Sequence, residues 1–489
     1  MSQKNTIAKN TTYLTIASII QKVISFGYYA FLAAAIGEAQ LGQYDAALKF
    51  TSVFIIFMDF GLGPLMTREI AKDESKLDEY FQKVLSIKFV LIFVSLVAMI
   101  ISAGLWNEFS DNVDISDVWL ILFGGLIIVL DTLTFTFFSI FRAKKELQWE
   151  AVGIIIYQAT ILAAGFTAIR LDLSLMHILG ALFAGSLVQF LYMGTMLLKK
   201  AKLEFHFTWN WQWVKSFLML AAPFAFAGIL FRLNGTADSL MLKTMAGNSA
   251  AGWYALAFKL AFALTVLPGA FATSYYPVMS DYYKNAKEKL HTVFEQGMVY
   301  MMAIGFPISA GVLVIGDELI IRVWKQAYEA SIEPLWILMI ALPFIFFNYP
   351  IGNFLNAVDR QKLNTINMSI ALIINIVLNA VLIPLYTFNG AAIAATVSSV
   401  VLVLLGLPWV YKVAPFRIGY LAKKTLLFGI SASIMAVSLF TVQNDLNTIV
   451  LIIIGALLYT GATIATTAIT PAELKQLFGG VFRKFSRGK

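Results

Sequence analysis

Residues 252–259 read GWYALAFK, and residues 42–49 read GQYDAALK. Both octets follow the pattern G-x-Y-x-x-A-x-K, and each lies inside a long apolar stretch. The same offset of 210 positions sets the basic residues Lys22 and Arg232 opposite each other upstream of the octets. The chain therefore carries two related copies of one segment. A fold that explains this pattern must give the lysine of each copy a polar environment.

The composition assigns the chain to the membrane proteins. Of its 489 residues, 59% are hydrophobic and 13% are charged, and the mean hydropathy is +0.78. Soluble domains carry about 25% charged residues. The chain has no cysteine and three histidines, so we expect no disulfide, no metal site and no cofactor. Its net charge of +8 lies mostly in loops between apolar stretches, which indicates contact with membrane lipids and not with nucleic acid.

Apolar stretches long enough to cross a bilayer recur along the whole chain. A transmembrane helix needs about 20 apolar residues. We therefore predict an all-α, polytopic membrane protein with about 14 transmembrane helices. The first stretch is longer than the roughly 7–15 apolar residues of a signal peptide, so we expect a retained helix. The predicted spans are 11–36, 41–66, 82–104, 117–141, 149–169, 175–198, 213–243, 249–278, 291–314, 333–356, 363–385, 390–411, 420–441 and 447–469.

The loops between the predicted spans differ in charge. One set is rich in lysine and arginine, whereas the other set has few basic residues and includes the acidic loop 107–117. Basic loops remain on the cytoplasmic side of a membrane. We expect a multi-pass protein of the inner (cytoplasmic) cell membrane with both termini in the cytoplasm. The basic segments are 72–76, 142–145, 199–202, 284–289, 359–362, 412–417 and 483–489.

The repeat divides the predicted helices into two groups. The matched segments begin the first and the seventh span, so one unit contains six helices. An even number gives both units the same orientation, which predicts two pseudo-symmetric lobes related by an axis along the membrane normal. The expected parts are an N-terminal lobe of helices 1–6 (1–205), a C-terminal lobe of helices 7–12 (206–415), helices 13–14 (416–470) and a basic cytoplasmic tail (471–489).

Four basic residues lie deep within the predicted spans, namely Lys22, Lys49, Arg232 and Lys259. A charge at the centre of a transmembrane helix costs roughly 2.5–3.5 kcal/mol on insertion scales. A water-filled cavity between the lobes would remove most of this cost, and the pseudo-twofold axis would gather the four cations around it. We therefore predict an anion-binding cavity lined by these side chains.

Acidic residues offer a second explanation for the deep charges. Asp45 precedes Lys49 by one helical turn, so an intrahelical ion pair is the alternative for this lysine. The second copy lacks the acid. Asp131, deep in the fourth predicted span, either balances the charge of a cation or carries a coupling proton. Lys88 and Lys243 lie nearer the ends of their spans, where we expect the side chains to snorkel to the interface.

The stretch MDFGLGPLMTREIAKD (58–73), preceded by GQYDAALKF, resembles the second helix and following loop of the polysaccharide flippases. These are the O-antigen and exopolysaccharide exporters of the multidrug/oligosaccharidyl-lipid/polysaccharide superfamily. The resemblance covers essentially the whole chain. It implies a transporter, not an enzyme, that moves isoprenoid-diphosphate-linked oligosaccharides from the cytoplasmic to the outer leaflet by alternating access. It also implies that the basic residues of helices 1, 2 and 8, here Lys22, Lys49 and Lys259, bind the diphosphate, with Arg232 added from helix 7.

Two other functions stay open from the sequence. A multidrug exporter of the same superfamily would share the fold, but organic cations call for acidic cavities, whereas the repeated deep charges are basic. A membrane polysaccharide polymerase or glycosyltransferase would need substantial outer loops, and the first outer connection is only GEAQLG (37–42). The expected partners are the lipid-linked oligosaccharide, membrane lipids and polysaccharide assembly machinery, and we expect a functional monomer. The coupling ion stays open: a proton, sodium or none.

Overall fold

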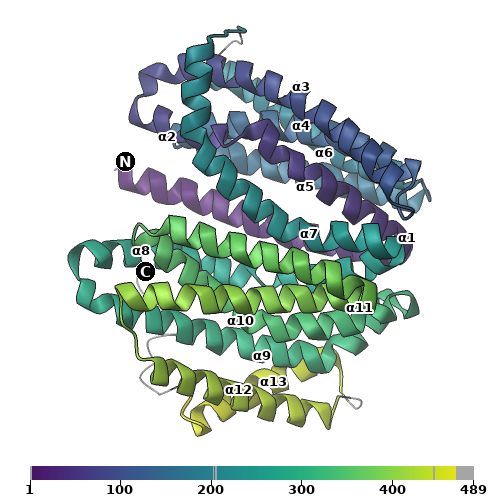
Figure 1. Ribbon diagram of the computed structural model, residues 1–489, viewed down its shortest axis with the longest axis vertical. Coiled ribbons are helices and arrows are strands. Elements are labelled where there is room, and N and C mark those ends of the chain that lie inside the picture. Colours follow the sequence, from purple (N-terminus) through teal and green to yellow (C-terminus); the bar gives the residue numbers. More distant parts are fainter. Residues whose placement is uncertain (1–2, 202, 204–205, 444–445, 470–489) are drawn as a thin grey trace. The chain divides into compact units, whose positions relative to one another are not determined.

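The computed structural model describes residues 3–201, 203, 206–443 and 446–469, with side chains from residue 17 onward within these ranges. The described residues form helices joined by short loops, and no strand occurs among them (Figure 1). Apolar segments in a bilayer become helical because a helix satisfies its backbone hydrogen bonds internally. The α-helices are α1 (Gln3–Asp59), α2 (Leu62–Lys72), α3 (Leu77–Phe109), α4 (Ile115–Ala143), α5 (Leu147–Arg170), α6 (Leu175–Met196), α7 (Trp211–Ala263), α8 (Val266–Asn285), α9 (Leu290–Trp324), α10 (Ile332–Ala357), α11 (Gln361–Val413), α12 (Ile418–Phe440) and α13 (Thr448–Ala465). Shorter helical turns are η1 (Glu74–Lys76), η2 (Leu197–Ala201), η3 (Lys287–Lys289) and η4 (Gln326–Ser331).

Three long helices are each interrupted at one non-helical residue. The break in α1 is at Gly37 (φ 77°, ψ 173°), that in α7 is at Gly247 (φ 81°, ψ −171°), and that in α11 is at Thr387 (φ 49°, ψ −126°). Positive φ angles suit glycine, which has no Cβ to clash with the backbone. Gly37 and Gly247 correspond under the 210-position offset, so the two copies share a backbone break as well as a sequence pattern.

Eleven helical segments of the described chain are long and apolar enough to span a membrane. The predicted all-α, multi-pass membrane class is therefore confirmed, while the number of fourteen spans stays a prediction. Large apolar side chains cover the outer faces of these helices, as in Phe93, Val437 and Leu457, which are 69%, 67% and 69% exposed. Extended apolar surface of this kind marks a protein that faces lipid.

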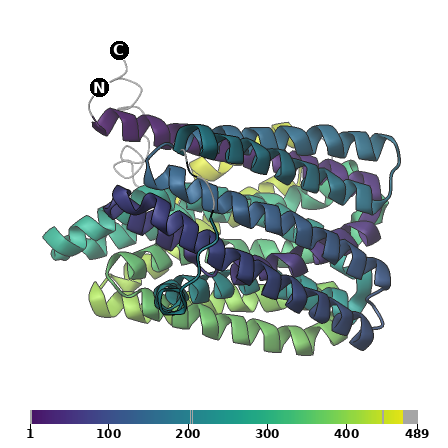
Figure 2. The ribbon, with the colours of Figure 1, turned by 90° about the horizontal axis from the view of Figure 1, so that it is seen from above.

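The chain divides into two compact units, residues 1–255 and 256–489. The first contains α1–α6 and most of α7, drawn in purple to teal in Figures 1 and 2, and the second contains the end of α7 and α8–α13. The division predicted from the repeat stays a prediction; its parts are 1–205, 206–415 and 416–470. The predicted basic tail, 471–489, lies outside the described residues.

The core of the first unit is built from side chains of several helices. Leu65 of α2, Phe81 of α3, Phe141 of α4 and Met193 of α6 are at most 1% exposed. Close packing of this kind holds neighbouring helices at fixed distances. It sets the positions from which polar side chains of α1, α4 and α7 meet.

Candidate functional site

The first residues of the two octets, Gly42 and Gly252, lie at a close contact between α1 and α7 within the first unit. A Cβ on Gly42 would lie 2.0 Å from the backbone oxygen of Asn248, and a Cβ on Gly252 would lie 1.8 Å from that of Glu38. Both distances are far below the 3.0 Å that real Cβ atoms respect. Glycine is therefore required at the first position of each octet, because the backbones of α1 and α7 approach too closely for a side chain.

A polar cluster connects the first octet, on α1, with the second octet, on α7. The Nζ atom of Lys49 lies 2.8 Å from Oδ2 of Asp45 and donates a 2.5 Å hydrogen bond to Oγ of Ser239. Tyr254, from the second octet, is fully buried and donates its hydroxyl hydrogen to Oδ2 of Asp238 at 2.9 Å. Lys49 and Tyr254, one side chain from each octet, thus bond two consecutive residues of α7, Ser239 and Asp238. We call these five residues the repeat cluster.

The ion pair between Asp45 and Lys49 is the alternative that the sequence left open for this lysine. The two side chains are 17% and 16% exposed, so the pair is largely withdrawn from solvent. Charges at i and i+4 of a helix lie on one face, which explains the contact. A cavity that gathers Lys49 with the other predicted cations stays a prediction.

The other predicted anion ligands have different surroundings. Lys22 is exposed on α1, and Arg232 is half-buried on α7. No ion pair joins a carboxylate to either residue within the described ranges. Lys259 is half-buried in the last turns of α7, which belong to the second unit.

Asp131 lies between helices of the first unit. Its Oδ1 accepts a 2.7 Å hydrogen bond from Oγ of Ser186, which joins α4 to α6. Among the described residues no cation pairs with Asp131. Its two predicted roles, charge balance and proton carriage, both stay predictions. Across the same described ranges, no three His, Asp or Glu side chains gather where they could hold a metal ion.

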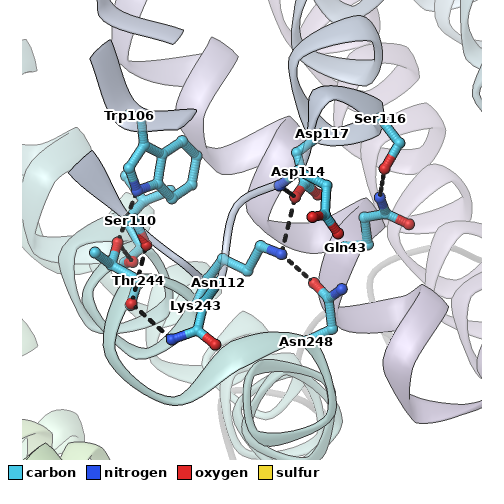
Figure 3. Close-up of polar contacts among 11 residues, drawn as sticks. Gln43, Trp106, Ser110, Asn112, Asp114, Ser116, Asp117, Lys243, Thr244 and Asn248 are labelled. Carbon is cyan, nitrogen blue, oxygen red and sulfur yellow. Dashed lines mark hydrogen bonds and ion pairs between the residues drawn. The ribbon is translucent and has the colours of Figure 1, made fainter. Parts of the chain in front are cut away.

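A second polar network surrounds the break in α7 (Figure 3). Lys243 is fully buried, and its Nζ lies 3.0 Å from Oδ2 of Asp117 in α4 and donates to Oδ1 of Asn248. The same carboxylate oxygen accepts the backbone N–H of Asp114 at 2.8 Å, which completes a capping box at the start of α4. One buried carboxylate therefore both caps α4 and holds α7.

Thr244 forms the other half of this network. Its hydroxyl oxygen accepts a 2.9 Å bond from Nε1 of Trp106, and its backbone oxygen accepts bonds from Ser110 Oγ and Asn112 Nδ2 at 3.2 and 3.1 Å (Figure 3). Because the helix breaks at Gly247, carbonyls just before the break lose their normal helical donors. Side chains from the end of α3 and the loop after it supply the missing donors.

The prediction that Lys88 and Lys243 snorkel to the interface was wrong. Both side chains are 0% exposed. The Nζ atom of Lys88 lies 2.5 Å from Oδ1 of Asp59 and donates to the backbone oxygen of Thr132 at 3.0 Å. A carboxylate from a neighbouring helix makes burial favourable where a lone ammonium would have to reach water.

Sequence reasoning missed three acceptors that organise these sites. Asp117 carried a signal, since Asp114 and Asp117 are spaced as a capping box ahead of an apolar run. Asp238 and Ser239 form a polar pair inside an apolar span, which is a weaker signal. Nothing local indicated that both octets would meet on that pair.

Comparison with known proteins gives consistent matches. The family model described as Polysaccharide biosynthesis protein matches residues 7–283, and the MatE model matches residues 223–381. Capsular polysaccharide biosynthesis protein CapF of Staphylococcus aureus is 22% identical over 406 residues, covering 81% of this chain and 97% of that protein. Probable low-salt glycan biosynthesis flippase Agl15 of Haloferax volcanii is 21% identical over 481 residues, covering 96% and 98%. The solved structure of lipid II flippase MurJ in an inward closed conformation has a TM-score of 0.76 at 17% identity, covers 96% of this chain and 99% of its own, and shows a common fold.

Proposed function

Since this chain belongs to the polysaccharide biosynthesis protein family, we propose that it is a flippase for lipid-linked oligosaccharides. It moves isoprenoid-diphosphate-linked oligosaccharides from the cytoplasmic to the outer leaflet by alternating access, for cell-surface polysaccharide assembly. It works as a transporter and performs no covalent chemistry. Similarity along most of the chain to a protein named a glycan flippase supports the proposal.

The observation that carries the substrate class is the position of Arg232. Its side chain is half-buried in an apolar helix, and no ion pair joins it to a carboxylate within the described ranges. The diphosphate is the strongly anionic part of a lipid-linked oligosaccharide. A guanidinium forms two parallel hydrogen bonds with a phosphate, which offsets the cost of its burial. Lys22, Lys49 and Lys259 are the further diphosphate ligands of this proposal.

Lys49 exchanges partners during transport. Its contacts with Asp45 and Ser239 are the ones that a bound diphosphate would displace. An arriving diphosphate competes with Asp45 for the ammonium group, and Asp45 balances the charge when the substrate leaves. The i, i+4 geometry makes this exchange local, since a side-chain rotation suffices to separate the two groups.

Asp131 is the residue we assign to coupling. A carboxyl group within a membrane-spanning bundle is a common proton carrier in transporters. Its bond to Ser186 persists in either protonation state, because a hydroxyl can donate or accept.

The proposed topology has both termini in the cytoplasm of a cell with an inner membrane. The excess of lysine and arginine in alternate loops supports this orientation. The lobes are 1–205 and 206–415, and helices 13–14 within 416–470 are an addition outside the repeat. The protein works as a monomer in contact with membrane lipids and polysaccharide assembly machinery.

Translocation by reconstituted protein tests the proposal. Proteoliposomes with fluorescent lipid-diphosphate oligosaccharide in the inner leaflet report its arrival outside. We expect transport by the wild type and at least tenfold slower transport by Lys49→Ala/Lys259→Ala, with Lys76→Ala as the control because Lys76 is an exposed lysine paired with Asp73. Equal transport rates in the wild type and the double variant would show that Lys49 and Lys259 do not bind the diphosphate. Efflux of an organic cation in place of the oligosaccharide would establish the multidrug alternative.

A further inference from the structure

A pocket lined by cationic and aromatic side chains opens between α2, α3 and the start of α7. Its volume is about 360 Å³. Figure 1 shows the start of α7 beside α2. The lining includes Arg68, Glu69 and Lys72 of α2, Tyr80 of α3, and Trp213 and Phe217 of α7. None of these residues belongs to the repeat cluster or to the diphosphate ligands proposed above.

One edge of the pocket is basic. Nε of Arg68 and Nζ of Lys72 both bond Oε1 of Glu69, at 2.8 and 2.9 Å. Two cations against one carboxylate leave a net positive charge at this edge. The side chains of Arg68 and Lys72 are 45% and 61% exposed, so they can reach a ligand that arrives from water. Because the bond to Glu69 uses Nε, the terminal N–H pair of Arg68 presents the fork that binds phosphate.

The aromatic lining residues Tyr80, Trp213 and Phe217 form a wall of rings. Trp213 stacks on Phe217 with centroids 4.4 Å apart and planes 15° apart, and Tyr80 packs against Phe217 at 5.6 Å. Nζ of Lys83 lies 4.8 Å from the Trp213 ring and pairs with Oε1 of Glu79 at 2.5 Å, so the charge of this ammonium group is already balanced. Phe217 is 4% exposed, so the half-buried rings of Tyr80 and Trp213 are the surfaces that can receive the C–H face of a sugar ring, while Glu69 can accept its hydroxyl groups.

Interfacial anchoring does not account for the direction of Trp213. Trp209 and Trp211 are 43% and 65% exposed, as expected of tryptophans at a membrane surface. Trp213 is turned instead onto Tyr80 and Phe217. An anionic phospholipid would use the basic edge and leave the aromatic wall without a role. The combination of edge and wall therefore favours a saccharide that carries phosphate.

We propose that this pocket is a separate binding site for a phosphorylated saccharide, which captures the head of the lipid-linked substrate at the cytoplasmic face before translocation. The role in capture and the side of the membrane rest on the proposed function. The ligand chemistry, a sugar ring joined to phosphate, rests on the pocket itself.

Calorimetric titration of the full-length protein in detergent tests the site. The probe is N-acetylglucosamine 1-phosphate, and all proteins carry Arg232→Ala and Lys49→Ala, which remove two of the proposed diphosphate ligands. We expect saturable binding that Arg68→Gln and Trp213→Leu each weaken at least fivefold. The matched controls are Lys76→Gln, which removes an exposed lysine outside the pocket lining, and Trp209→Leu, which removes an exposed tryptophan; both should bind as the parent does. Arg68→Lys keeps the charge but loses the two-pronged guanidinium, so we expect an affinity between those of the parent and Arg68→Gln. This variant serves as the test if Arg68→Gln or Trp213→Leu fails to fold.

Three further arms separate the sources of the phosphate. Free N-acetylglucosamine and inorganic phosphate should each bind more weakly than the joined compound. Nanodiscs of phosphatidylglycerol should not displace the probe; displacement that depends on Arg68 would establish an anionic lipid site and overturn the proposal. Equal affinities in the pocket variants and their controls would overturn it as well. Probe binding that depends on Arg68 and Trp213, together with no translocation of lipid-linked oligosaccharide by the wild-type protein, would support the pocket and refute the proposed function.

Discussion

Removing the positive charge of Lys243 tests whether its buried ion pair holds α7 against α4. Nζ lies 3.0 Å from Oδ2 of Asp117, and the side chains are 0% and 4% exposed. Lys243→Met keeps an unbranched chain of similar length but leaves the Asp117 carboxylate buried without its ammonium partner. Loss of one partner of a buried pair costs about 3–5 kcal/mol. Each step of about 1.4 kcal/mol is tenfold, so the unfolding equilibrium should shift by roughly a hundredfold or more.

Unfolding in mixed micelles of dodecyl maltoside and SDS, followed by circular dichroism, measures this loss. Adding Asp117→Asn to Lys243→Met removes the stranded charge and still accepts the N–H of Asp114, so the double variant should recover at least half of the lost free energy. The control Lys76→Met breaks an exposed pair and should leave the transition unchanged. A loss below about 1 kcal/mol in Lys243→Met, the size of an exposed pair, would refute the reasoning.

Three further changes test the rest of the site. Gly252→Ala places a Cβ 1.8 Å from a backbone oxygen and should lower the midpoint of thermal unfolding by several degrees, whereas Gly104→Ala, which meets nothing within 4 Å, should not; equal midpoints would contradict the close contact. Tyr254→Phe removes one donor from Asp238, which is 6% exposed, and should cost about 1–3 kcal/mol in the micelle assay; unchanged stability would mean that the bond contributes nothing net. Asp131→Asn should abolish the response of translocation to a pH gradient in proteoliposomes, and a retained response would assign coupling to another residue.

The helical membrane fold could be predicted because its signals are local. The length of an apolar run can be read directly from the sequence, and an internal repeat can be found by comparing the chain with itself. The 210-position offset also identified Gly37 and Gly247 as equivalent, and both have the same positive-φ break. The ion pair of Asp45 with Lys49 was foreseen as an alternative, because the two residues are one turn apart.

The buried pairs between helices could not be predicted in this way. Lys88 meets Asp59 across two helices, and Lys243 meets Asp117 in the same manner. Position within a span indicates the depth of a lysine but not the direction of its side chain or the identity of the facing helix. For that reason, snorkelling was expected where the structure has counterions.

The contact of the two octets has the reciprocity of a twofold dimer interface. Under the 210-position offset, residue 38 corresponds to 248 and residue 42 to 252. Gly42 meets the carbonyl of Asn248, and Gly252 meets the carbonyl of Glu38, so each copy receives what it offers. A larger residue at either glycine would therefore clash with the backbone of the other copy. Once the segment was duplicated within one chain, its surface had to fit against a second copy of the same surface.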